Sequence, residues 1–188
     1  ALTVSKSGLE AWRAAVFVDA SGDGDMGAAA GCPTVTGDEQ GECMPPSYCF
    51  MVINVDRARL GDTKRVNEAM ARGKAEGRLR NPDDHRGEKD IFGPREMLFN
   101  YNHVYGLDCL DADGLTRGVV EGRETAFELL GYLRETVPGF EAATIGSTAS
   151  LLGVRETRRI LGDFVLEGKA YFESERHDDD ICVYDYAV

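Results

Sequence analysis

A short apolar run that leads into a glycine-rich turn constrains the fold of this chain more than any other feature. Residues 14–20 read AAVFVDA, a nearly continuous apolar run with β-branched residues, which is typical of a strand buried on both faces in a parallel sheet. The run continues into SGDGD at 21–25 and then into MGAAA at 26–30, which indicates a first helical turn. A strand, a glycine-rich turn and a helix start point backbone N–H groups at a ligand phosphate. This segment is therefore the first candidate binding site.

Two other interpretations of residues 19–25 stay open. Oxygen-bearing residues at relative positions 1, 3, 5 and 7, with glycine at position 6, resemble the calcium loop of an EF-hand. The twelfth position is Ala30, where that loop needs a bidentate carboxylate, and a predicted strand precedes the turn in place of a helix. A purely structural turn is the other interpretation, because Asp and Gly populate turns in general.

The rest of the chain predicts an α+β fold, with a mixed or antiparallel sheet and packed helices. One helix is expected over 63–76 with Asp62 as its cap, and a longer one over 116–136 with Thr116 as its cap. Gly118 and Gly122 within the longer helix indicate either a weaker helix or close packing. Strands are expected near 48–55, 97–105, 144–150 and 158–166, an irregular connection over 31–47, and a further strand over 180–188.

Composition and charge narrow the class of partner. With 33 Asp and Glu against 21 Lys and Arg, the net charge of −12 argues against an extended nucleic-acid surface. No stretch approaches the roughly 18 apolar residues that a membrane helix needs, and no targeting segment is visible. The 5 cysteines are irregularly spaced, and His85, His103 and His177 are isolated, so neither a disulfide scaffold nor a metal site is expected. We therefore expect a cytoplasmic protein that binds neither nucleic acid nor a membrane.

Blocks of sequence along most of the chain resemble a known family. VFVDASGDGDMGAAAG at 16–31 looks like the IDATGDGDLAAAAG segment of the FAD-dependent oxidoreductase family, which has the glutathione-reductase type of FAD-binding fold. DGLT at 113–116, EGR at 121–123, VPGFE at 137–141 and GVRETRRILGDFVL at 153–166 follow in the family's order. The resemblance implies FAD as the cofactor and hydride transfer between the flavin and a small organic substrate.

The resemblance also implies an internal portion of a longer protein. Such proteins are expected to open with a strand–GxGxxG–helix unit for the FAD pyrophosphate, and residues 1–21, which precede the glycine-rich turn, contain no GxGxxG. Residues 1–47 are then a remnant strand and turn of an α/β FAD-binding domain with a connection, and 48–188 are a substrate-side α+β domain, incomplete at its C-terminus. FAD binding by this piece alone is expected to be weak or absent, and the piece is expected to be inactive. The unpaired edge of strand 14–20 predicts a homodimer.

Two groups of residues carry the chemistry that the resemblance implies. Small residues let the backbone of the turn approach FAD closely, and Asp23 and Asp25 either hydrogen-bond the turn or cap the next helix. The cofactor-binding residues implied are Ala20, Ser21, Gly22, Asp23, Gly24 and Asp25. No metal-binding residue is expected.

The arginines at 155, 158 and 159 form the second group. Because Arg binds carboxylates bidentately and a cation stabilises a reduced, anionic flavin, Arg155 is the predicted catalytic residue. Structural pairing is predicted for Arg158 or Arg159, and ion pairs with Glu156 or Asp163 are the alternative for the cluster. Tyr101 and His103 are acid–base candidates by chemistry, although such residues in a strand more often serve packing. The alternative function is a non-catalytic α+β module whose loop at 19–25 is structural or binds calcium.

Overall fold

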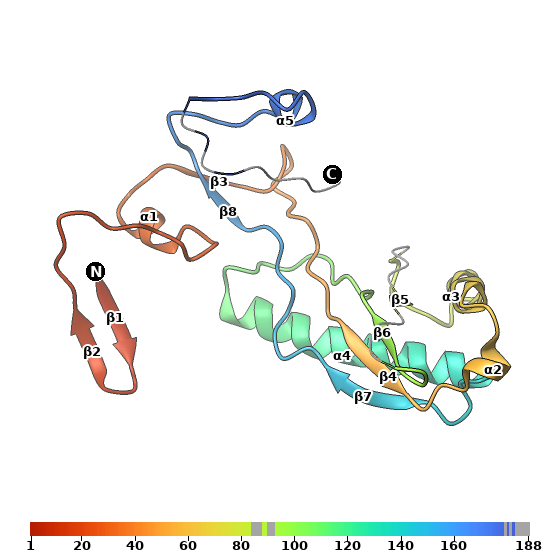
Figure 1. Cartoon of the computed structure of the whole chain (residues 1–188). Coiled ribbons are helices and arrows are strands. Elements are labelled where there is room, and N and C mark those ends of the chain that lie inside the picture. Colours follow the sequence, from red (N-terminus) through yellow and green to blue (C-terminus); the bar gives the residue numbers. More distant parts are fainter. Residues whose placement is uncertain (84–87, 90–92, 179, 181, 183–188) are drawn as a thin grey trace. The chain divides into compact units, whose positions relative to one another are not determined.

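The structure is a computed structural model that describes residues 1–83, 88–89, 93–178, 180 and 182, and it divides into two compact units (Figure 1). Unit 1 contains residues 1–35 and 159–188, and unit 2 contains residues 36–158. The chain has an α+β fold, as the sequence predicts. The domain boundary expected at residue 47 stays a prediction.

Unit 2 is built on a four-stranded antiparallel sheet in the order β5–β6–β4–β7. Its strands are β4 (Phe50–Ile53), β5 (Glu88–Lys89), β6 (Met97–Phe99) and β7 (Thr144–Thr148). Phe50 pairs with Phe99 across β4 and β6, and their rings stack with centroids 4.9 Å apart. The predicted strands near 48–55, 97–105 and 144–150 are confirmed, although β6 ends well before residue 105.

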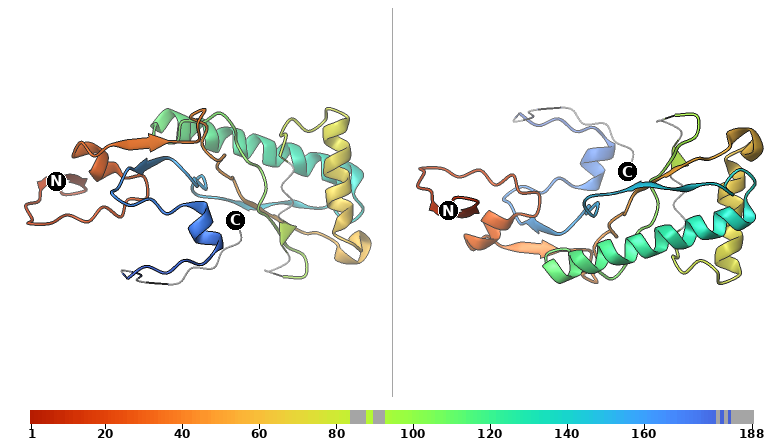
Figure 2. Two further views of the ribbon diagram at one scale, coloured as in Figure 1. Left: turned by 90° about the horizontal axis from the view of Figure 1, so that it is seen from above. Right: turned by 90° about the horizontal axis from the view of Figure 1, so that it is seen from below.

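Helix α4 (Ala112–Thr136) runs along the sheet of unit 2, as two views show (Figure 2). The prediction that Thr116 caps this helix is wrong. Asp111 is the N-cap, with an extended backbone and a side chain that accepts the Gly114 N–H at 3.0 Å. Because Asp is as good a cap as Thr, the helix begins one turn earlier. Thr116 lies inside the helix, where its hydroxyl donates to the Ala112 carbonyl at 2.8 Å.

Glycines on one face of α4 allow other residues of unit 2 to pack closely against the helix. A Cβ at Gly122 would lie 2.5 Å from Tyr48 Cβ, and one at Gly118 would lie 2.6 Å from Leu107 Cδ1. Real Cβ atoms do not approach other carbons so closely, so a larger residue at either position would force its neighbours to shift. The close-packing interpretation of Gly118 and Gly122 is confirmed.

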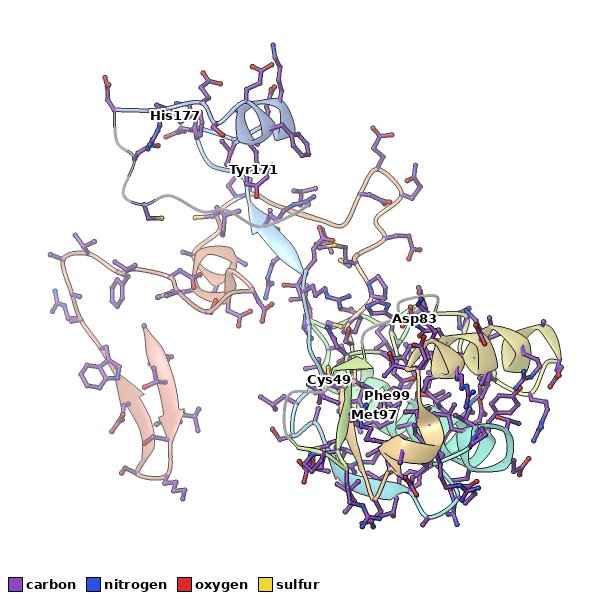
Figure 3. All side chains as sticks on the ribbon, turned by 45° about the vertical axis from the view of Figure 1, so that its right-hand side comes forward. Cys49, Asp83, Met97, Phe99, Tyr171 and His177 are labelled. Carbon is purple, nitrogen blue, oxygen red and sulfur yellow. The ribbon has the colours of Figure 1, made fainter. Side chains whose placement is uncertain are left out.

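Two further helices complete unit 2. They are α2 (Arg57–Leu60) and α3 (Lys64–Ala75), and α3 confirms the helix predicted over 63–76. Asp62 precedes the cap position, which Thr63 occupies, yet its carboxylate accepts the Lys64 N–H at 2.9 Å. The core lies between the sheet and the helices and includes Phe50, Val52, Val66, Met70, Met97, Phe99, Leu129, Leu133 and Phe140. Figure 3 labels Met97 and Phe99 within it.

Unit 1 holds short elements, and none of its described residues is buried. Strands β1 (Leu2–Ser5) and β2 (Gly8–Ala11) form an antiparallel hairpin. The other elements are α1 (Asp25–Ala29), α5 (Gly168–Phe172) and most of β3 (Thr34–Thr36) and β8 (Arg158–Ile160), of which Thr36 and Arg158 belong to unit 2. Strands β3 and β8 pair in a two-stranded sheet, so the connection predicted to be irregular over 31–47 contains a strand.

One strand prediction in these segments is wrong, and another is confirmed only over its first residues. Residues 14–20 form no strand, and Val16 and Val18 are 77% and 81% exposed. An apolar run becomes a strand only where a neighbouring strand pairs with its backbone, and none of the strands described here pairs with it. The strand predicted over 158–166 shrinks to Arg158–Ile160 and pairs with β3 outside the sheet of unit 2. The strand predicted over 180–188 falls almost wholly outside the described residues.

Candidate functional site

Asp19 organises the glycine-rich turn of unit 1. Its Oδ1 accepts the Ser21 N–H at 3.0 Å and the Ser21 hydroxyl at 2.7 Å, and its Oδ2 accepts the Gly27 N–H at 2.9 Å. These hydrogen bonds, that from Gly27 first, lower the pKa of Asp19 from 3.8 to about 2. One carboxylate thus ties the start of the turn to the first turn of α1.

The predicted cofactor-binding residues lie together in this turn. The Ser21 hydroxyl oxygen accepts the Asp25 N–H at 3.1 Å, and the Gly24 carbonyl accepts the Ala28 N–H at 2.9 Å. Gly22 and Gly24 have φ values of 89° and 63°, in the left-handed region that favours glycine. A Cβ at Gly22 would meet no atom within 4 Å, so the backbone there is open to close approach by a ligand.

Glycines also fit the turn against β8. A Cβ at Gly27 would lie 2.4 Å from Ile160 Cδ1, and one at Gly24 would lie 3.2 Å from the same atom. A larger side chain at either position would require the Ile160 side chain of β8 to shift. The glycines of the segment therefore serve two purposes, namely packing at Gly24 and Gly27 and an open backbone at Gly22.

The calcium interpretation finds no support in this geometry. The carboxylate that would be the first ligand, that of Asp19, accepts hydrogen bonds from its own turn. In the part of the chain that the structure describes, no group of three or more His, Cys, Asp or Glu is arranged to hold a metal ion.

Arg155 lies in a separate array within unit 2. Ser47, just before β4, forms backbone bridges to His103 on one side and to Gly153 on the other. These bridges extend the β6–β4–β7 order beyond the ends of the strands and bring His103 and Arg155 together. Arg155 Nη1 donates to the Pro45 carbonyl at 2.9 Å and lies 2.6 Å from His103 Nε2, and Nη2 donates to Ser47 Oγ at 2.6 Å.

A buried carboxylate fixes the imidazole of His103. Asp83 Oδ1 lies 3.0 Å from His103 Nδ1, and the two side chains are 3% and 12% exposed. Asp83 Oδ2 accepts the backbone N–H groups of Asn102 and His103, each at 3.1 Å. Because a guanidinium only donates, His103 Nε2 must accept from Arg155, and the imidazole proton then sits on Nδ1 and points to Asp83. We call Asp83, His103 and Arg155 the Asp–His–Arg array.

An amide network holds the array to helix α4. Asn81 Nδ2 donates to Asn102 Oδ1 at 2.7 Å and to the His103 carbonyl at 3.1 Å. Asn102 Nδ2 donates in turn to the Gly122 carbonyl on α4, and the Thr125 hydroxyl donates to Asn102 Oδ1. Satisfied buried networks of this kind fix one arrangement of their members.

Two neighbouring residues have other roles. Tyr101, an acid–base candidate from the sequence, is 2% exposed and belongs to the hydrophobic core. The Cys49 thiol donates to Asn100 Oδ1 at 3.3 Å, and burial raises its pKa while the positive charge of Arg155 opposes the rise. Figure 3 shows Cys49 and Asp83 in unit 2. The five cysteines are free thiols.

Unit 2 also has a pocket of about 470 Å³. Two of its lining residues, Pro46 and Glu156, directly follow Pro45 and Arg155 in the sequence. Glu42, Asp108 and Glu156 line it, and none of its described lining residues is Lys, Arg or His. The lining therefore disfavours an anion. None of the described helices is long and apolar enough to cross a bilayer.

Comparison with known proteins gives the family. The family model described as FAD dependent oxidoreductase matches residues 1–188. This chain belongs to the FAD-dependent oxidoreductase family. No curated protein and no solved structure matches it.

The turn of unit 1 fits FAD in two observable respects. Gly22 leaves its backbone uncovered, and the Asp19 hydrogen bonds hold the turn in one conformation without using the side chain of Ala20. Both properties suit a backbone edge that a flat cofactor approaches closely.

The sequence analysis did not identify the residues that position the turn at 19–25 and the guanidinium of Arg155. Asp19 stands two residues before Ser21, and that spacing is the signature of an Asx-turn. Asp83 and Ser47 carried no such signal, because their roles depend on contacts with His103 and Arg155, which lie far away in sequence.

Proposed function

We propose that this chain forms part of an FAD-dependent oxidoreductase that transfers hydride between the flavin and a small organic substrate. The observation that carries the proposal is the family match over residues 1–188, which includes the turn at 19–25. FAD, when bound, supplies the redox chemistry, and the protein supplies binding, orientation and electrostatics.

The turn would hold one edge of FAD. Ala20, Ser21 and Gly22 offer backbone that lacks bulky side chains, and Asp19 keeps this backbone in place before the cofactor arrives. Asp23, Gly24 and Asp25 complete the turn, with Asp25 in the first turn of α1. A turn that is already ordered loses little conformational entropy when it binds a ligand.

Arg155 would act on the substrate or on the reduced flavin as a fixed cation. Its three hydrogen-bonding partners are neutral acceptors, so its positive charge is not cancelled by a carboxylate in direct contact among the described residues. A cation held in position stabilises negative charge that develops beside it.

The second candidate function is the non-catalytic module with a structural turn. The observation in its favour is that Asp19 finds its hydrogen-bond donors inside the turn. The cytoplasmic location and the homodimer remain predictions.

The test is an NMR titration of the chain with FAD. FAD is expected to shift the backbone amide resonances of residues 21–25 with weak affinity, and Gly22→Ala is expected to reduce these shifts. Gly41→Ala is the matched control, because Gly41 also has a positive φ, of 80°, and open space at its Cβ. FAD-induced shifts at 21–25 that are equally large in the unsubstituted chain and in Gly22→Ala would favour the structural turn.

A further inference from the structure

We infer that Arg155 is a receptor for a ligand carboxylate and that His103 and Asp83 hold its guanidinium ready for this purpose. Arg155 is exposed, although its anchor is not: Asp83 is 2% exposed. A flexible surface arginine would have to be ordered on binding, whereas this one is ordered beforehand.

Counting donors shows which edge of the guanidinium is available. Arginine has five N–H donors, and three of them go to Pro45, His103 and Ser47. Both protons of Nη1 are used, so one proton on Nη2 and the Nε proton have no acceptor among the residues that the structure describes. These two lie on adjacent nitrogens, and such a pair binds the two oxygens of one carboxylate side-on.

The charges around the Asp–His–Arg array favour the binding of a ligand carboxylate at Arg155. Among the described residues, no Asp or Glu is within ion-pair distance of Arg155, and the charge of Asp83 reaches it only through a neutral imidazole. The nearby pocket is lined by Glu42, Asp108 and Glu156, which repel an anion. The carboxylate is therefore assigned to Arg155 itself and not to the pocket.

His103 is a positioning residue in this proposal. Its Nε2 accepts from Nη1 only while the imidazole is neutral, and Asp83 secures the tautomer that leaves Nε2 unprotonated. The assignment of the carboxylate to the redox substrate rests on the proposed function, but the binding itself does not require FAD.

The test is an NMR titration of the FAD-free chain with acetate at constant ionic strength, with acetamide as the neutral analogue. Acetate is expected to shift the Nε–H resonance of Arg155, which is assigned by its loss in Arg155→Lys, and acetamide is not. The exposed Arg134 on α4 is the internal control, and its Nε–H resonance should not saturate. Equal responses to acetate and acetamide, or equal responses of Arg134 and Arg155, would overturn the proposal.

Two variants test the positioning role. His103→Ala should weaken acetate binding about two- to tenfold, the expected cost of ordering one long side chain on binding. His103→Gln should restore most of the affinity, because its amide oxygen can accept from Nη1. If His103→Ala does not fold, Ser47→Ala, which removes the acceptor for Nη2, should show a similar loss. Unchanged acetate affinity in the folded variant would refute the role of the array.

Discussion

Replacing Gly122 by alanine tests how closely α4 packs on the strands that carry the site. The new Cβ would lie 2.5 Å from Tyr48 Cβ and 2.6 Å from Tyr48 Cγ, so the helix or the tyrosine must move. Adding a methyl group to a well-packed core costs about 1–3 kcal/mol. Alanine also gains about 1 kcal/mol over glycine in a helix interior, so the net loss of stability is expected at about 0–2 kcal/mol.

Gly131 on the same helix provides the matched control. It is exposed, and a Cβ there would meet no atom within 4 Å. Gly131→Ala should therefore keep only the gain in helix propensity and stabilise unit 2 by up to about 1 kcal/mol. Because propensity cancels between the two variants, the difference in their free energies of unfolding isolates the packing cost of about 1–3 kcal/mol.

The assay is urea unfolding of both variants followed by far-UV circular dichroism, which reports the 25-residue helix α4. The single tryptophan, Trp12, lies in unit 1 and is not a suitable probe. The midpoint should fall for Gly122→Ala and rise for Gly131→Ala at an unchanged slope. Equal stabilisation by both substitutions would refute the close packing of α4 on Tyr48.

Three further predictions follow from the local chemistry. Because the pKa of Asp19 is lowered from 3.8 to about 2, its stabilisation of the turn is complete above pH 3.8 and is lost as the pH falls toward 2. The Gly27 amide resonance should therefore titrate with a midpoint near 2, and a midpoint of 3.8 would exclude its hydrogen bond to Asp19. Because burial raises the pKa of Cys49, mass spectrometry should find it alkylated by iodoacetamide more slowly than the exposed Cys32, and an equal rate would contradict the burial. Asp83→Asn places an amide donor among buried donors, so it should lower the free energy of unfolding, measured with urea, by about 1–3 kcal/mol. An unchanged free energy of unfolding would argue against the buried carboxylate.

Local sequence patterns predicted the elements whose formation depends on local chemistry or on strong periodicity. The helix at α3, the strand at β4 and the end of α4 before Pro138 and Gly139 fall in this class. The glycines on α4 also gave a correct indication of packing, because a glycine inside a strong helix needs a reason.

The failures share a physical cause, since they depended on partners that a single segment does not reveal. Residues 14–20 are apolar enough for a buried strand, yet a strand needs a neighbour that pairs with its backbone. The extent of β8 was likewise decided by its pairing with β3. Asp83 entered the site through its contact with His103, and no sequence spacing predicts such a contact.

For the arginine cluster, the sequence indicated the site residue but not its partners. Residue chemistry selected Arg155 among the three arginines as the site residue, and the structure gives it partners different from the ion pairs with Glu156 or Asp163 that were the alternative. Whether Arg155 takes part in catalysis stays a prediction.

The protonation state of His103 tests the central claim, that a buried carboxylate and an imidazole hold Arg155 in place. A long-range proton–nitrogen NMR spectrum of the chain at neutral pH distinguishes the two neutral tautomers from the imidazolium. The Asp–His–Arg array predicts a neutral ring with its proton on Nδ1, directed at Asp83, and an unprotonated Nε2 that accepts from Arg155. A proton on Nε2 would contradict it, because that nitrogen could then accept nothing from the guanidinium.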